Sequence, residues 1–259
     1  MSDTSIYMDM HAHIIPGVDD GSQSIEESIE MMRQAYQENI RVIIATPHFG
    51  LRNPDYDREK AERILDDLRR IASEMFPDLH LFMGNELYYS YGILESLLEG
   101  KAKTLAGTKY VLVEFSPDTD YSEIRKAVNE FTWNGYWPII AHAERCSSLT
   151  DHLEAVRTLV DKGAYIQVNC RSFLDGGSGA KRKRFGRNNG FYLEQRQDWS
   201  MKLLNAGLVH FIASDCHSSG MRKPIYQTAV DTIIMQGGEK ELLKITKTNI
   251  LGLIRNERI

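Results

Sequence analysis

The residues best suited to chemistry are histidines and acids that recur along the chain, beginning with His11 and His13. They follow the apolar run Ile6-Tyr7-Met8, which is typical of a strand. Side chains at i and i+2 of a strand share a face, so Asp9, His11 and His13 are expected to point the same way. Two adjacent imidazoles suit a metal ion. Taken alone, the pair would fit a polar loop equally well.

The other candidates lie at or just past the ends of further apolar runs. They are His48, Glu86, Glu114, His142, Asp215 and His217, with Asp20 in the acidic turn after His13. The carboxyl ends of parallel barrel strands converge on one face, where such folds place their active sites. Helix capping or backbone hydrogen bonding explains any one of these residues but not the whole set. The set exceeds the four ligands that zinc usually takes, and it suits two or three divalent ions.

A cluster of this kind favours phosphate-ester hydrolysis. Adjacent cations turn bound water into hydroxide near neutral pH and neutralise phosphate oxygens. Arg145 and Arg222 follow His142 and His217 closely, and their guanidinium groups are expected to bind phosphate. The alternative for both is a solvated surface arginine.

The elements that must position these residues alternate between strand and helix. Strands are predicted at 6–10, 41–46, 79–83, 110–115, 137–141, 164–169 and 208–213, and helices at 24–36, 57–75, 93–98, 121–134, 151–161, 198–205 and 225–254. Regular βα alternation indicates a parallel sheet. No Gly-x-Gly-x-x-Gly turn follows the first strand, which argues against an open doubly wound sheet. We therefore expect an α/β fold, a barrel of seven βα units, formed by residues 1–259 as one domain.

Composition narrows the class of protein. The 259 residues are 42% hydrophobic and 26% charged, with a net charge of −5, so we expect no nucleic-acid partner. The three cysteines, at 146, 170 and 216, are far apart and indicate reduced thiols rather than disulfides. Neither a signal peptide nor a membrane span is predicted, so we expect a cytoplasmic protein.

These motifs resemble the polymerase and histidinol phosphatase (PHP) superfamily. The matching segments are Asp9-x-His11-x-His13, Thr46-Pro47-His48, Gly84-Asn85-Glu86, His142-Ala143-Glu144-Arg145 and Ser214-Asp215-Cys216-His217. Within it, the chain is most similar to the metal-dependent protein-tyrosine phosphatases of bacterial capsule loci. That similarity rests on His-x-His-Ile-Ile-Pro-Gly-Val-Asp-Asp-Gly, Val113-Glu114-Phe115 and the run 208–215, and it covers essentially the whole chain.

The resemblance implies a distorted, TIM-like (β/α)7 barrel that holds a metal cluster. Manganese is the metal with which such proteins are commonly active, and iron and zinc are alternatives. By motif, one ion would be held by His11, His13, Glu86 and Asp215, a second by Glu86, Glu114 and His142, and a third by His48, His217 and Asp20. Arg145 and Arg222 would bind phosphate, a metal-bridging hydroxide would attack phosphorus, and Asp20 or a metal-bound water would protonate the leaving group. The implied substrate is the phosphotyrosine-rich tail of an autophosphorylating bacterial kinase that controls capsule or exopolysaccharide export. A homo-oligomer is left open.

The chain departs from the family pattern at three places. Ala143 replaces a usual proline and Cys216 a usual small residue, and neither supplies a ligand. The stretch Asp175–Gly190 is longer than the family connection and carries five positive charges. It is expected either to clamp an acidic phosphopeptide or to be a mobile solvated loop.

Three other readings compete with this one. The spacing Cys216-x5-Arg222 fits a cysteine-dependent phosphatase, in which a thiolate attacks phosphorus. A metal site could instead act on a small phosphomonoester such as histidinol phosphate, or on nucleic acid, which the acidic charge disfavours. A regulatory binder without activity would have lost a ligand, and none is missing.

Overall fold

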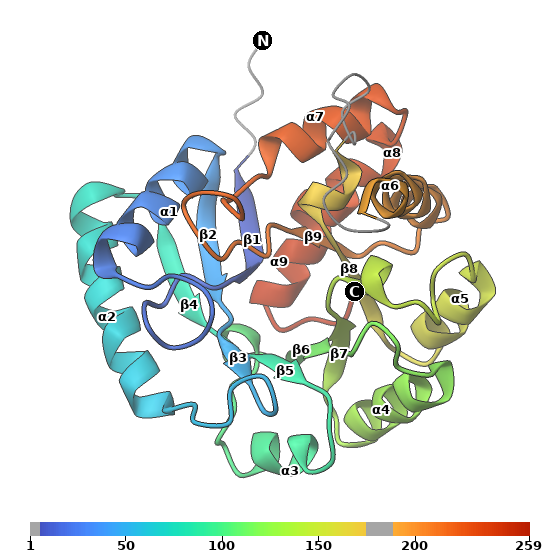
Figure 1. Ribbon diagram of the computed structural model, residues 1–259, viewed down its shortest axis with the longest axis horizontal. Coiled ribbons are helices and arrows are strands. Elements are labelled where there is room, and N and C mark those ends of the chain that lie inside the picture. Colours follow the sequence, from blue (N-terminus) through green and yellow to red (C-terminus); the bar gives the residue numbers. More distant parts are fainter. Residues whose placement is uncertain (1–5, 175–188) are drawn as a thin grey trace.

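The strands form two parallel sheets whose carboxyl ends face the same region (Figure 1). The computed structural model describes residues 6–174 and 189–259, except for the side chains of 189–196. One sheet has the order β1-β2-β4 and the other β3-β5-β6-β7-β8-β9, and each pairing is parallel. The strands are β1 (Tyr7–Ala12), β2 (Ile40–Ala45), β3 (His48–Phe49), β4 (His80–Met83), β5 (Glu86–Tyr88), β6 (Tyr110–Glu114), β7 (Trp137–Ile140), β8 (Tyr165–Asn169) and β9 (Phe211–Ala213). Together they make a half-barrel of parallel strands inside an α/β fold.

Two of the seven predicted strands are followed by short additional strands that belong to the other sheet. The break after β2 falls at Pro47, which lacks the N–H of an ordinary residue, and β3 then begins at His48. The break after β4 falls at Gly84 and Asn85. The Gly84 N–H donates to the Ala45 carbonyl at 2.8 Å, and a Cβ at Gly84 would lie 2.8 Å from Leu105 Cδ2. Both breaks precede a candidate ligand, His48 or Glu86.

The carboxyl end of the first strand meets the segment that directly follows the last strand. Ala12 and Cys216 form a parallel bridge, the His13 N–H donates to the Cys216 carbonyl at 2.9 Å, and the Asp215 N–H donates to the His11 carbonyl at 2.9 Å. This contact brings the loop after β9 beside the loop after β1.

Most of the helices lie around the outside of the sheets, as Figure 1 shows. They are α1 (Ile25–Gln37), α2 (Arg58–Met75), α3 (Ile93–Leu98), α4 (Tyr121–Trp133), α5 (Leu153–Asp161), α6 (Asn189–Asn205), α7 (Gln227–Met235), α8 (Glu239–Leu243) and α9 (Asn249–Ile254). Ser24 caps α1 by accepting from the Glu27 N–H at 3.2 Å, as the Ser-x-x-Glu pattern predicts. Helix α6 begins nine residues before the predicted start, and the predicted helix at 225–254 is divided between α7 and α8 at Gly237 and Gly238.

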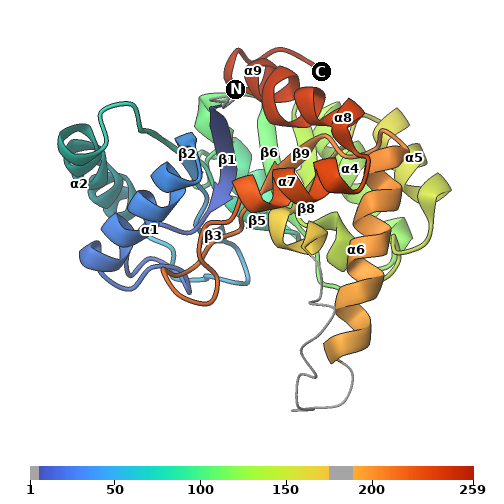
Figure 2. The same ribbon diagram turned by 90° about the horizontal axis from the view of Figure 1, so that it is seen from above.

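The core has two parts separated by the sheets. The larger part packs the helices onto the sheets, and the smaller part fills the space inside them. Met10, Tyr110 and Phe211 belong to the inner part, together with Ile250 and Leu253 of α9. Helix α9 therefore covers the end of the sheets opposite the loops that follow β1 and β9 (Figure 2).

The described residues include no helix that is long and apolar enough to span a membrane.

Candidate metal centre

The structure brings all nine predicted ligands into one connected cluster at the carboxyl ends of the strands. Eight of them are buried, and Asp20 is the exposed member. They are His11, His13, Asp20, His48, Glu86, Glu114, His142, Asp215 and His217. Their convergence agrees with the prediction from the strand ends, although the role of each as a ligand stays a prediction.

Glu86 lies at the centre of the cluster. Its Oε1 is 2.8 Å from His142 Nε2 and 3.3 Å from His11 Nε2, and its Oε2 is 2.9 Å from His48 Nδ1 and 3.3 Å from His13 Nε2. One carboxylate therefore faces four imidazoles, two of them from β1 and its carboxyl end, one from β3 and one from the segment after β7. A carboxylate in this position has the geometry to bridge two cations.

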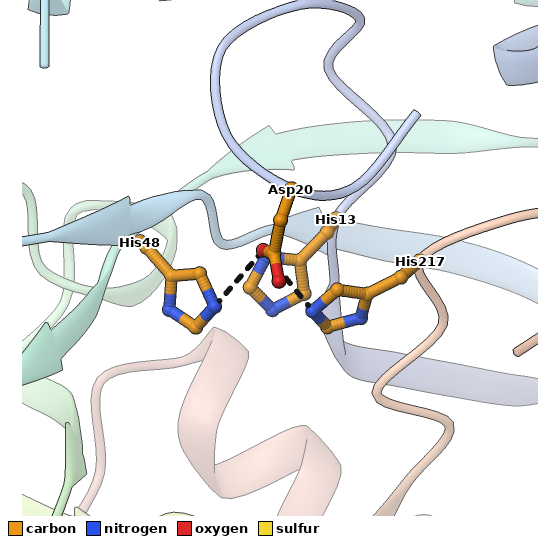
Figure 3. Close-up of side chains that lie close together, drawn as sticks. All are labelled: His13, Asp20, His48 and His217. Atoms are coloured by element: carbon orange, nitrogen blue, oxygen red, sulfur yellow. Dashed lines mark ion pairs between the residues drawn. The ribbon is translucent and has the colours of Figure 1, made fainter. Parts of the chain in front are cut away.

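A second grouping lies toward the open side of the cluster (Figure 3). Asp20 Oδ1 is 3.2 Å from His48 Nε2 and 3.5 Å from His217 Nε2, and the His13 and His217 rings have centroids 3.8 Å apart. The Asp20 side chain is 64% exposed, whereas the three imidazoles are buried. This grouping is therefore reachable from solvent.

Three sets of side chains have ligand atoms that all lie within 4.8 Å of one another. They are His13, Asp20, His48 and His217; His11, His13 and Asp215; and His48, Glu86 and Glu114. These sets overlap with the ligand groups implied by the resemblance but divide them differently. His13 and His48 each belong to two sets, and His142 approaches the cluster through Glu86.

The cluster fits divalent ions on the evidence of its buried polar atoms. Glu86 Oε2, Glu114 Oε2 and His48 Nδ1 are buried and form no hydrogen bond of good geometry with any residue in the described part of the chain. Buried polar atoms are nearly always satisfied, and an ion is one of the standard reasons for an exception. All three atoms belong to the same set of potential ligands. Oxygen and nitrogen donors without thiolate suit manganese, iron or zinc.

The electrostatics of the cluster reflect burial opposed by close opposite charges. Burial alone would raise the pKa of Glu86, but the charge and hydrogen bond of His11 bring that pKa well below its usual value. Burial and the Glu86 charge raise the pKa of Glu114. Burial and the His13 charge lower the pKa of His217 to about 3, which leaves its nitrogen lone pair free to bind a cation near neutral pH.

Two of the cluster residues also have an unusual backbone conformation. His142 (φ 31°) and Asp215 (φ 51°) adopt left-handed conformations that non-glycine residues rarely take. Such strain collects at functional sites, where the surrounding structure compensates for it. In β1, the pairing with β2 shifts register between Asp9 and Ala12.

That register shift explains why the predicted direction of the Asp9 side chain differs from the structure. Asp9 does not join the cluster of His11 and His13. It accepts hydrogen bonds from the Ser214 N–H at 3.0 Å and from the Ser214 hydroxyl. Simple alternation along a strand does not hold across an irregularity in pairing.

Two arginines border the cluster at Asp215. Arg145 Nη2 is 2.7 Å and Arg222 Nη2 is 3.0 Å from Asp215 Oδ2. Their side chains are 33% and 42% exposed, so both guanidinium groups lie between the buried carboxylate and solvent. The predicted proximity of both arginines to the cluster is therefore found in the structure.

Comparison with known proteins identifies the family. The model of the family described as "Capsular polysaccharide synthesis, CpsB/CapC" matches residues 7–255. The chain belongs to this family. It is 32% identical to the tyrosine-protein phosphatase CpsB of Streptococcus pneumoniae, covering 97% of this chain and 100% of that one. It is also 32% identical to the tyrosine-protein phosphatase YwqE of Bacillus subtilis, covering 97% and 93%.

A solved structure supports the same assignment to the CpsB/CapC family. It comes from work on Bacillus subtilis YwqE and Streptococcus pneumoniae CpsB, described there as unique metal-dependent tyrosine phosphatases. It matches with a TM-score of 0.80 and 31% identity over 97% of this chain and 96% of that one.

Within this CpsB/CapC protein, the thiol of Cys216 is poorly placed for nucleophilic attack. The residue is 1% exposed, and burial together with the Asp9 charge raises the pKa of the thiol. A nucleophilic cysteine needs a lowered pKa and access to its substrate. The geometry thus disfavours a mechanism based on Cys216-x5-Arg222.

Four residues beside the candidate ligands were not among the predicted site residues. Asp19 Oδ2 is 2.7 Å from His13 Nδ1 and accepts a hydrogen bond from the His48 N–H at 3.0 Å. Arg52 Nη2 donates to Glu114 Oε1 at 3.0 Å. Gln167 and Asn169 contact His11 and Asp215 from behind. Asp19 had a signal, because it adjoins Asp20 in the acidic turn. The two amides of β8 had none, since a polar residue in a strand is unremarkable. Most of the Asp175–Gly190 stretch lies outside the described residues.

Proposed function

We propose that this protein hydrolyses phosphotyrosine on protein substrates with divalent metal ions held by the cluster around Glu86. The observation that carries the proposal is a buried cluster of carboxylates and imidazoles beside two arginines, in which Glu86 Oε2, Glu114 Oε2 and His48 Nδ1 form no hydrogen bond of good geometry within the described residues. Membership of the CpsB/CapC family, with tyrosine-protein phosphatases among its relatives, supports the same activity.

The ligands are proposed to hold two or three ions, manganese being the favoured metal. When bound, such ions would activate water for attack on phosphorus and neutralise phosphate oxygens. His11, His13 and Asp215 would hold one ion, and Glu86 would connect it to a second ion near Glu114 and His142. His48, His217 and Asp20 would hold the third. The overlap among the three sets found in the structure is compatible with shared ligands.

Arg145 and Arg222 would bind the phosphate group of the substrate. Both already share one oxygen of Asp215, so turning one guanidinium toward a phosphate leaves the carboxylate paired with the other. A planar guanidinium matches two phosphate oxygens at once.

Asp20 is proposed as a ligand rather than a proton donor. The hydrogen bond from His48 lowers the pKa of Asp20 well below its usual value, so the carboxyl group is ionised near neutral pH. A phenolate is a good leaving group, and its departure places little demand on an acid.

The proposed substrate is a phosphotyrosine-bearing protein, namely the tail of an autophosphorylating kinase that controls capsule or exopolysaccharide synthesis. An exposed Asp20 at the rim of the cluster supports access by a protruding phosphotyrosine side chain. We further propose a single catalytic domain with the strands arranged as a distorted (β/α)7 barrel. The contact between β1 and the loop after β9 supports that arrangement. Cytoplasmic location and self-association are also proposals.

The test is hydrolysis of a phosphotyrosine peptide by the parent protein before chelation, after chelation, and after manganese is added back. His142→Ala is compared with His152→Ala, which removes an exposed imidazole on the N-terminal side of α5. We expect chelation to abolish activity and added manganese to restore it. His142→Ala should be inactive, and His152→Ala should keep the parental activity. Unimpaired activity after thorough chelation would refute metal dependence. Hydrolysis of histidinol phosphate but not of the peptide would refute the substrate assignment alone.

A further inference from the structure

We infer that Gln167 and Asn169 of β8 orient His11, His142 and Asp215 for metal binding. Their side-chain amides form a hydrogen-bonded chain with a fixed donor-to-acceptor direction, here called the relay. Strand β8 contributes none of the nine candidate ligands, yet it lies between β7 and β9, whose ends carry His142 and Asp215. Both amides are buried and face the cluster through hydrogen bonds. The inference rests on the metal site of the proposed function.

The direction of the relay is determined by the backbone N–H of His142. That group can only donate, and it donates to Gln167 Oε1 at 2.8 Å. The oxygen of the Gln167 amide must therefore face His142, and its NH₂ group must face the other way. The same oxygen is 3.2 Å from His11 Nδ1, so His11 Nδ1 carries the proton and donates.

This arrangement leaves the Nε2 lone pair of His11 directed toward the cluster. His11 Nε2 is 3.3 Å from Glu86 Oε1 and 3.5 Å from Asp215 Oδ1. A histidine that binds a metal through one nitrogen almost always donates from the other to a fixed acceptor, and that acceptor sets the tautomer and ring direction. For His11, the acceptor is a neutral amide whose own orientation the His142 backbone dictates.

The other end of the relay acts on Asp215. The NH₂ group of Gln167 donates to Asn169 Oδ1 at 2.8 Å, which turns the NH₂ group of Asn169 toward Asp215 Oδ2, also at 2.8 Å. Asp215 Oδ2 also forms ion pairs with Arg145 and Arg222. Asp215 Oδ1 is thereby left for the cluster, where it lies 3.5 Å from His217 Nδ1. One backbone donor thus specifies which atom of an imidazole and of a carboxylate remains available to an ion.

The test measures binding of Mn²⁺ alone to the metal-free protein, with no substrate present. Gln167→Leu removes the acceptor, whereas Gln167→Glu retains an acceptor for His11 and His142. Gln236→Leu, an exposed glutamine after α7, is the matched control. Loss of a partner behind a metal ligand weakens metal binding about 10- to 100-fold. We expect that loss for Gln167→Leu, a smaller one for Gln167→Glu, and none for the control.

A double-mutant cycle separates positioning from general destabilisation. If Gln167 acts through the ligands it contacts, Gln167→Leu must cost less Mn²⁺ affinity in a His11→Ala background than in the parent. Unchanged Mn²⁺ affinity in a folded Gln167→Leu protein, or an equal loss in both backgrounds, would overturn the relay. If Gln167→Leu does not fold, parental Mn²⁺ affinity in a folded Asn169→Leu protein would overturn it at Asp215. Failure to hydrolyse phosphotyrosine with parental Mn²⁺ binding would count against the proposed function alone.

Discussion

Replacing Arg145 tests its proposed role in binding the phosphate group of the substrate. The Arg145 guanidinium donates to Asp215 Oδ2 at 2.7 Å and is one-third exposed, so it is held at the edge of the cluster yet reachable by a substrate. A hydrogen bond to a charged group contributes about 1.5–3 kcal/mol. Arg145→Ala is therefore expected to lower kcat/KM for a phosphotyrosine peptide about 10- to 150-fold. Arg145→Lys keeps the charge but not the planar pair of donors, and its loss should be intermediate.

The stability of the Arg145→Ala protein should change little, because Asp215 keeps Arg222 and Asn169 as partners. The assay is steady-state kinetics with metal in excess, alongside thermal unfolding. Arg157→Ala is the matched control, since Arg157 lies on α5 in an exposed pair with Glu154. A kcat/KM for Arg145→Ala equal to that of the Arg157→Ala control would refute the role in phosphate binding.

Three further perturbations have outcomes that the structure predicts. Cys216→Ser should change kcat/KM less than about tenfold, because the thiol is buried with a raised pKa; loss of all activity would restore the thiolate mechanism. Gly21→Ala would make a Cβ clash with the His13 carbonyl oxygen, and it should cost about 1–3 kcal/mol of stability and reduce bound metal, measured by unfolding and metal analysis. Parental values for both would contradict the close approach. Burial and the nearby Lys244 charge lower the pKa of His210 to about 4, so the unfolded chain binds the proton more readily and stability falls as pH drops from about 6.5 toward 4. The free energy of unfolding of His210→Asn, measured by denaturant titration at each pH, should therefore fall by about 3 kcal/mol less than that of the parent over this range. A pH profile parallel to that of the parent would show that His210 does not titrate as described.

The meeting of the candidate ligands was predictable because all except Asp20 lie at or just past the end of an apolar run that had to be a buried strand. Parallel strands bring their carboxyl ends together regardless of the details of pairing. His48, Glu86 and His142 could therefore be grouped from the chain alone. Their individual pairings depend on distances that spacing does not contain, which is why the three structural sets differ from those that the resemblance implied.

The remaining differences arise where the chain departs from regular geometry. The register shift in β1 separates Asp9 from His11, and no pattern of alternation reveals it. The breaks at Pro47 and Gly84 move β3 and β5 into the second sheet. Uncharged amides such as Gln167 carry no mark of function in a sequence, since their role follows from the atoms they face.

The central claim is that metal held by the buried cluster is responsible for phosphotyrosine hydrolysis. The most direct measurement titrates manganese into the metal-free protein and follows bound metal and peptide hydrolysis in the same samples. The account predicts no hydrolysis without metal, and activity that rises with occupancy and saturates at more than one ion per chain. Full activity in the metal-free protein, or hydrolysis that does not change as metal binds, would contradict it.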